Sequence, residues 1–286
     1  MKLSLFVVVI GTLLGGAASG GAQGNLIPSG VPAPTMKSLA QIEPRTPVDA
    51  VNTPGNFLAQ FIITQPGSYY LTSNILGVSG KRGIQIQTSN VTLDLNGFSM
   101  LGVSDALDGI YFTSAAITNF LARNGVISGW SGGTGIYFLG KNGTFEHLNL
   151  SENNNGIRFG DGGRITRCTV NGNKRNGISV SGSACTVIEN HCAENNTLKD
   201  SSAAGISVNG SGNRIEGNHV SGSGTAGYGI HIGSTPYTNN IVIRNSVLGG
   251  GVNNYSFDTL QIVGPLITNT VSGIITNLNP WANLSF

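Results

Sequence analysis

The sequence predicts an all-β solenoid in which short parallel strands stack turn upon turn. Two observations carry this prediction: a Gly-Ile motif that recurs seven times, and a repeat length of 21 to 28 residues (157 to 178 and 178 to 206, for example) without helical periodicity. In each copy the first and third residues after the glycine are apolar and the residue between them varies, as in a strand with one buried face. The copies are Gly83-Ile84-Gln85-Ile86, Gly109-Ile110-Tyr111-Phe112, Gly135-Ile136-Tyr137-Phe138, Gly156-Ile157-Arg158-Phe159, Gly177-Ile178-Ser179-Val180, Gly205-Ile206-Ser207-Val208 and Gly229-Ile230-His231-Ile232.

A second segment follows each Gly-Ile strand and indicates a corner in every turn. Its fourth position is asparagine in five of seven turns, namely Asn96, Asn124, Asn190, Asn218 and Asn245, and it is Leu148 or Cys168 in the two middle turns. Backbone groups at such a corner point inward, and stacked Asn amides can satisfy them and bond to one another. Asn also tolerates the left-handed backbone conformation that a bend demands. We therefore expect about eight turns of three short strands with an internal Asn ladder.

The composition argues against nucleic acid as a partner and indicates a structure of strands and turns. The formal charge of +2 is too small to indicate binding to nucleic acid. The polarity comes mainly from Asn, Ser, Thr and Gly, which suits strands joined by tight turns. The three cysteines, Cys168, Cys185 and Cys192, have irregular spacing that predicts small buried side chains rather than a disulfide framework.

The chain divides into four predicted parts. Residues 1–22 resemble a signal peptide, with Lys2 before an apolar stretch from Leu3 to Leu14 and small residues up to Ala22; the alternative is a membrane anchor, for which the stretch is short. We then expect a Pro-rich arm or cap over 23–56, a β-helix over 57–260 and a C-terminal cap over 261–286, because a solenoid needs both open ends covered. Removal of the leader would leave no membrane span and place the protein outside the cytoplasm, either secreted, periplasmic or at the cell surface.

The Gly-Ile strands and the Asn corner resemble those of the right-handed parallel β-helix proteins of the pectate-lyase-like superfamily. The resemblance covers roughly residues 60 to 260. Within the superfamily the sequence most resembles uncharacterised secreted bacterial β-helix proteins, which share segments such as Ile63-Thr64-Gln65-Pro66-Gly67-Ser68-Tyr69-Tyr70-Leu71 and Val91-Thr92-Leu93-Asp94-Leu95-Asn96-Gly97-Phe98. That group comes with no firm activity, so the resemblance implies a fold more strongly than a function.

The variable position of the Gly-Ile strands forms the predicted ligand surface. In the pectinolytic relatives the substrate groove runs along the outside of the equivalent sheet, so the resemblance implies carbohydrate binding by Tyr111, Tyr137, Arg158 and His231. Tyrosine rings can lie against sugar faces, and a guanidinium can bind a carboxylate or hydroxyls. The alternative is an aromatic ladder that only stabilises an exposed sheet.

Catalytic and metal signals are weak. A lyase needs carboxylates for Ca²⁺ and a base, and a glycosidase needs facing carboxylates, but the mapped column contains no acid. His191 and His219 occupy equivalent positions in consecutive turns, yet their column neighbours Thr169 and Ser246 offer no third strong ligand, so no metal site and no cofactor are predicted.

Three functional hypotheses remain open on the sequence. The favoured one is a secreted carbohydrate-binding or structural surface module without recognisable catalytic machinery, its partner a polysaccharide or cell-surface glycan. The alternative is a polysaccharide lyase or hydrolase that acts on an acidic glycan through the Gly-Ile face. The third is a self-associating element that docks on copies of itself.

Overall fold

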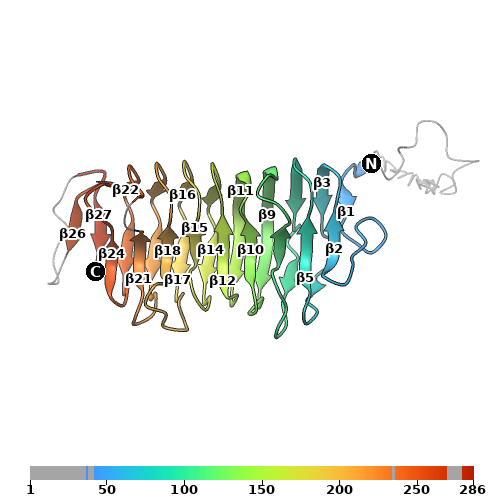
Figure 1. Ribbon diagram of the computed structural model, residues 1–286, viewed down its shortest axis with the longest axis horizontal. Helices are drawn as coiled ribbons and strands as arrows, with labels where there is room; N and C mark the ends of the chain where they lie inside the picture. The colour runs from blue at the N-terminus through green and yellow to red at the C-terminus, as the bar shows by residue number, and fades with distance from the viewer. Residues whose placement is uncertain (1–36, 38–41, 234–235, 269–278) are drawn as a thin grey trace, which may run out of the picture. The chain divides into compact units, whose positions relative to one another are not determined.

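The computed structural model describes residues 37, 42–233, 236–268 and 279–286. The predicted leader, residues 1–22, and the part of the predicted arm from 23 to 41, except Lys37, lie outside these residues. The chain divides into units 1–44 and 45–286, and the strands all lie in the second unit. In that unit they stack as a parallel β-helix, as predicted, from β2 near its N-terminal end to β24 near its C-terminal end (Figure 1).

Each turn contributes one strand to a first sheet of nine parallel strands, close to the eight turns expected from the sequence. The Gly-Ile motifs form seven of these strands. The nine are β2 (Ala59–Ile63), β5 (Arg82–Ile86), β8 (Ile110–Phe112), β10 (Thr134–Phe138), β12 (Asn155–Phe159), β15 (Ile178–Val180), β18 (Ala204–Val208), β21 (Tyr228–Ile232) and β24 (Asn253–Ser256).

The other two sides of the coil form one continuous sheet of eighteen strands. Its second face holds β1 (Thr46–Pro47), β3 (Gly67–Tyr70), β6 (Val91–Asp94), β13 (Arg164–Thr166), β16 (Thr186–Ile188), β19 (Arg214–Glu216), β22 (Ile241–Ile243) and β25 (Ile262–Val263). Its third face holds β4 (Ile75–Leu76), β7 (Ser99–Leu101), β14 (Thr169–Asn171), β17 (His191–Ala193), β20 (His219–Ser221), β23 (Ser246–Leu248), β26 (Leu266–Thr268) and β27 (Asn283–Ser285). The long strands β9 (Thr118–Ser128) and β11 (Lys141–Ser151) bend through the corner and belong to both faces.

The core is a column of apolar side chains inside the coil. The isoleucine that follows each motif glycine, from Ile84 to Ile230, is fully buried, as the alternation predicts. In the middle turns a stack of phenylalanines fills the interior, with Phe112 and Phe138 in edge contact at 4.6 Å between ring centroids. The three cysteines are free and buried, which confirms the prediction for them.

The predicted Asn ladder exists at the corner between the second and third faces, over part of its expected length. Asn190 donates through Nδ2 to Oδ1 of Asn218 at 3.0 Å, and Asn218 donates in the same way to Asn245 at 3.0 Å. Asn245 continues the ladder to Asn283 at 3.1 Å. At its other end, Oδ1 of Asn190 accepts the backbone N–H of Cys168 at 3.0 Å. The amides thus satisfy backbone groups that the corner removes from the sheet ladder.

Asn96 and Asn124 are not members of this ladder, and that part of the prediction was wrong. Both are exposed and have left-handed φ angles of 53° and 60°. The register pairs Leu148 with Gly125 rather than with Asn124, so the alignment by sequence was one residue out of step there. The two asparagines instead supply the positive φ of the bend, a conformation that Asn adopts more readily than most residues.

Two further amide ladders, which sequence reasoning missed, line the other corners. Asn173 donates through Nδ2 to Asn195 Oδ1 at 2.8 Å, and its own Oδ1 accepts the N–H of Asn153 at 3.0 Å. At the corner before the second face, Asn240 Oδ1 accepts the N–H of Asn213 at 2.9 Å. Buried amides therefore hold consecutive turns at all three corners of the coil.

Removal of one ladder amide tests this account. We expect Asn218→Ala to lower the free energy of unfolding by more than about 2 kcal/mol, because it strands the N–H of Asn190 and the carbonyl of Val187, which Asn218 Nδ2 bonds at 2.9 Å. Asn124→Gly is the control: it removes an exposed amide at a positive φ that glycine accepts, and should change stability by less than about 0.5 kcal/mol. Urea unfolding that shows equal losses for both variants would contradict the ladder's structural role.

Candidate functional site

The variable residues of the Gly-Ile strands form one straight outward column on the first sheet. The strand register joins them turn by turn, which confirms the predicted order. The column reads Gln85, Tyr111, Tyr137, Arg158, Ser179, Ser207 and His231. Because adjacent parallel strands lie about 4.8 Å apart, neighbouring members can contact one another directly.

Tyr111 on β8 and Tyr137 on β10 stack on each other. Their ring centroids are 5.7 Å apart and the ring planes differ by 16°. Both residues are half-buried, because neighbouring side chains cover part of each ring while the rest faces solvent. The sheet therefore carries two nearly parallel aromatic rings stacked one against the other.

Arg158 on β12 extends the pair by one turn. Its guanidinium carbon lies 5.7 Å from the centre of the Tyr137 ring, within the range of a cation–π contact. Its Nε donates to Ser181 Oγ at 2.8 Å, which fixes the direction of an otherwise exposed side chain. Tyr111, Tyr137 and Arg158 are thus brought together as the sequence predicts.

Arg82 at the start of β5 completes the group at the other end, and sequence reasoning missed it. Its guanidinium carbon lies 3.9 Å from the centre of the Tyr111 ring, closer than Arg158 is to Tyr137. Arg82 and Asp108 each directly precede a motif glycine, so they stand in neighbouring turns of one column, and Arg82 Nε lies 3.6 Å from Asp108 Oδ2. The four residues Arg82, Tyr111, Tyr137 and Arg158 are called the tyrosine platform below.

Asp108 is a mostly buried carboxylate at the edge of the platform. Its side chain is 16% exposed, and its Oδ1 accepts the backbone N–H of Thr134 at 2.9 Å. Burial raises the pKa of this carboxyl above its ordinary value, and this effect outweighs the opposing hydrogen bond from Thr134 and the charge of Arg82. Asp108 therefore serves to position Arg82 and the start of β10 rather than to present a free charge to solvent.

His231 does not join the platform. It stands three turns beyond Arg158, and the buried Ser179 and Ser207 lie between them. Its ring stacks on Tyr228 with centroids 4.6 Å apart and an 18° angle between planes. Burial lowers the pKa of His231 below its ordinary value, so the imidazole is neutral near pH 7.

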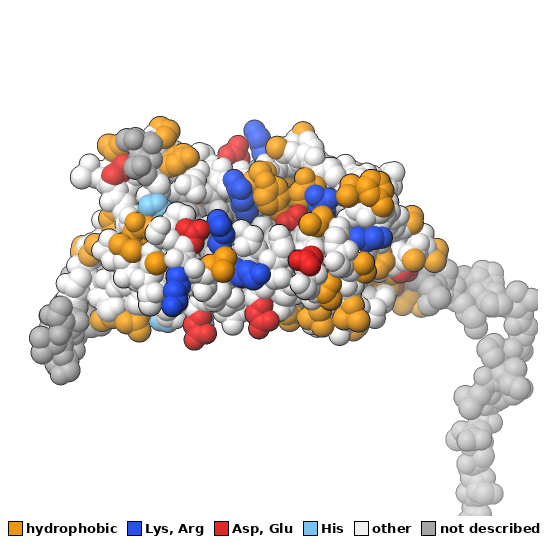
Figure 2. Space-filling model, turned by 60° about the horizontal axis from the view of Figure 1, so that its bottom comes forward, with side chains coloured by type: hydrophobic (Ala, Val, Ile, Leu, Met, Phe, Trp, Pro, Cys, Tyr) orange, Lys and Arg blue, Asp and Glu red, His pale blue; other side chains and the backbone are white. Residues whose placement is uncertain are grey.

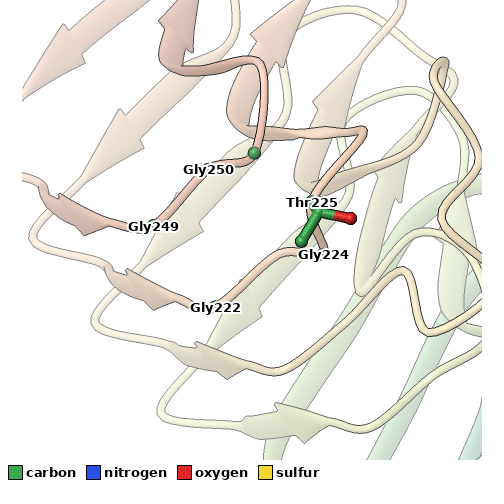
Figure 3. Close-up of a pocket in the computed structure, with 6 residues that line it drawn as sticks. Gly222, Gly224, Thr225, Gly249 and Gly250 are labelled. Carbon is green, nitrogen blue, oxygen red and sulfur yellow. The ribbon is translucent and has the colours of Figure 1, made fainter.

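Two surface hollows lie away from the platform, toward the C-terminal end. One hollow, of about 410 Å³, lies at the corner that follows the third face (Figure 3). It forms there because glycines at this corner contribute no side chains to fill the space. Its lining residues are Gly222, Gly224, Thr225, Gly249, Gly250 and Gly251. The other, of about 390 Å³, is an apolar hollow on the second face beside Trp281, whose ring carries the guanidinium of Arg244 at 4.7 Å. Neither hollow brings together carboxylates for hydrolysis.

The chemistry of the platform is that of recognition. Flat aromatic rings offer apolar area at low conformational cost, and guanidinium groups offer paired donors for carboxylates. The face shown in Figure 2 has Lys and Arg side chains among hydrophobic ones, with several Asp and Glu side chains between them. No helix within the described ranges has the length and apolar character needed to cross a lipid bilayer.

The coil and its exposed sheet place this protein in the class of parallel β-helix proteins, and comparison with known proteins supports this. The model of the family described as the right handed beta helix region matches residues 134–280, just over half of the 286 residues. The chain belongs to this family, which confirms the predicted fold. A search of curated proteins found no match.

Two solved structures align with this chain at low sequence identity. The Dettilon tailspike protein gp208 aligns at 17% identity and a TM-score of 0.53, over 74% of this chain and 47% of the tailspike chain. A double mutant of the periplasmic alginate epimerase AlgG aligns at 13% identity and a TM-score of 0.41, over 76% of this chain and 70% of that chain. This chain thus spans about half the length of the tailspike chain, and its likeness to the tailspike extends to the fold alone.

The balance of forces at Asp108 is open to test. The pKa of Asp108 is raised in the folded state, so its protonated carboxyl contributes to the free energy of unfolding at low pH. This contribution is lost as the pH rises from about 3.8 through the raised pKa. Asp108→Asn keeps an oxygen for the Thr134 N–H and removes this dependence, so we expect unfolding at pH 7 within about 1 kcal/mol of wild type and a flatter pH profile. Urea titrations between pH 4 and 7 measure both. A loss above about 2 kcal/mol at pH 7 would mean that the Arg82 ion pair outweighs burial.

Proposed function

We propose that the protein binds glycans, and acidic ones in preference, through the tyrosine platform of its first sheet. The observation that supports this most is the stacked Tyr111–Tyr137 pair, with the guanidinium of Arg82 against Tyr111 and that of Arg158 against Tyr137. The predicted ligand residue His231 lies three turns away, so we assign it to a separate, more distant contact with a long ligand.

The platform suits a linear polymer better than a small molecule. It lies on a sheet surface rather than in a closed cavity, so a ligand gains contacts by extending along the stacked turns. The faces of the two rings are covered by each other and by the guanidinium groups of Arg82 and Arg158, so the solvent-facing edges of the rings are what successive sugars can contact. Within the described residues, no hydrogen bond engages the terminal nitrogens of Arg158, so its fork can bind a uronate carboxylate.

A purely stabilising aromatic ladder is the competing interpretation. Cross-strand aromatic pairs strengthen sheets without any ligand, and they contribute about 0.2–1 kcal/mol. The exposed fork of Arg158 and its orientation by Ser181 favour binding, since a ladder requires neither. The two interpretations differ in what they predict for ligand retention and for stability.

An enzyme of the lyase or hydrolase type finds less support in the same face. Across all nine strands the outward column holds no carboxylate, and Asp108 beside it already pairs with Arg82 and Thr134. Glycosidases require two facing carboxyl groups, and lyases require a base beside a carboxylate-neutralising group. We therefore propose a binding role, in a protein exported by its predicted leader to the periplasm, the cell surface or the medium.

Substitution of the two tyrosines tests the proposal. We expect Tyr111→Ala/Tyr137→Ala to weaken binding to polygalacturonate or alginate by about tenfold or more, because loss of two ring contacts removes about 1.4 kcal/mol or more of binding free energy. Affinity gel electrophoresis measures the retention, with neutral dextran as a comparison polymer. Release of unsaturated uronates, followed by ultraviolet absorbance, would reveal lyase activity in the same samples.

A tyrosine on another face provides the control. Tyr70 on β3 is half-buried and carries the guanidinium of Arg45 at 4.6 Å from its ring centre, so Tyr70→Ala removes a similar arginine-stacked ring elsewhere. Tyr70→Ala should leave retention unchanged. If the double variant retains acidic glycans as wild type does but loses stability, the platform is a structural ladder and the proposal fails.

A further inference from the structure

A pair of histidines on the third face forms an arrangement independent of the tyrosine platform. His191 on β17 and His219 on β20 are direct partners in the parallel register. Both are exposed, and their ring centroids are 5.2 Å apart with 71° between the ring planes. Parallel pairing of two rigid strands, rather than a flexible loop, sets this separation.

The ring separation matches the geometry of two imidazoles that share one metal ion. A metal bound at about 2.1 Å to one nitrogen of each ring lies about 3.2 Å from each ring centre. Two rings that meet the metal at a right angle are then about 4.5 Å apart, and rings at a tetrahedral angle are about 5.2 Å apart. The observed 5.2 Å falls at the tetrahedral end of this range.

A third residue of the same column orients one of the rings. Ser246 on β23 follows His219 in the register, and its Oγ lies 2.6 Å from His219 Nδ1. If Nδ1–H donates to this hydroxyl, the free lone pair of His219 is on Nε2. A hydrogen bond that fixes the tautomer of a histidine in this way is the usual support of a metal ligand.

We propose that His191 and His219 form a two-histidine site for a divalent first-row transition metal, with Cu²⁺ bound most tightly. No cluster of three or more His, Cys, Asp or Glu with metal-binding geometry occurs in the described part of the chain, so water completes the coordination. Cu²⁺ stands highest in the affinity order of these metals for nitrogen and oxygen ligands, and this order, rather than the ring separation, selects it over Zn²⁺, which prefers the tetrahedral angle. The register, the ring separation and the bond to Ser246 carry the assignment.

The test uses full-length mature protein without a polyhistidine tag, titrated with CuSO₄ alone. We expect one tightly bound Cu²⁺ whose electron paramagnetic resonance spectrum shows coupling to two nitrogens. His191→Gln and His219→Gln should each weaken binding more than tenfold, and Ser246→Ala should weaken it by about tenfold.

Controls separate this site from adventitious copper. His147→Asn removes another exposed histidine and suits the positive φ of that position, so it should leave binding unchanged. Thermal unfolding without metal should give the same melting temperature for His191→Gln, His219→Gln and wild type, because both rings are exposed. If the His191→Gln/His219→Gln double variant binds Cu²⁺ as wild type does, or if wild type binds none, the proposal is overturned.

Discussion

The vertical register between successive turns is the constraint on which the rest of the structure depends. Each turn offers its backbone to the next through parallel pairing, but three corners per turn interrupt that pairing. Buried amides such as those of Asn190, Asn173 and Asn240 carry hydrogen bonds across the corners and link one turn to the next. The register, in turn, decides which outward side chains become neighbours. The surface chemistry therefore depends on the hydrogen bonds that the buried amides make at the corners.

The same constraint explains how two unlike surfaces arise on one coil. On the first sheet, register places Tyr111 against Tyr137 and produces an aromatic surface with arginines. On the third face it places His191 against His219. In both cases residues more than twenty positions apart in sequence become contacts without any loop rearrangement. Such surfaces are preorganised, because the strands that carry them are held on both sides by neighbouring turns.

Much of the fold could be predicted from the sequence, because the strand period and the Gly-Ile repeat are local signals that the core enforces. The residues that form the corners were harder to predict. The register pairs Arg123 with Glu146 and Gly125 with Leu148, so Asn124 stands one position before the ladder position, and it was placed in the ladder with Asn96 although both form the bend. The ladder through Asn213 and Asn240 could have been found in the sequence, because each of these asparagines stands two residues before an apolar residue of the second face, Ile215 and Val242. The platform's Arg82 shared its position with Asp108, but its contact with Tyr111 depends on side-chain direction, which spacing does not encode.

We propose that the stacking of Tyr111 and Tyr137, set by the strand register, makes the first sheet a glycan-binding surface. A crystal structure of the protein soaked with an oligouronate of six residues tests it most directly. We expect sugar density along the exposed edges of both tyrosine rings, with a carboxylate in the fork of Arg158. Density confined to the glycine-lined hollow, the apolar hollow beside Trp281 or the third face, with both rings bare, would contradict it.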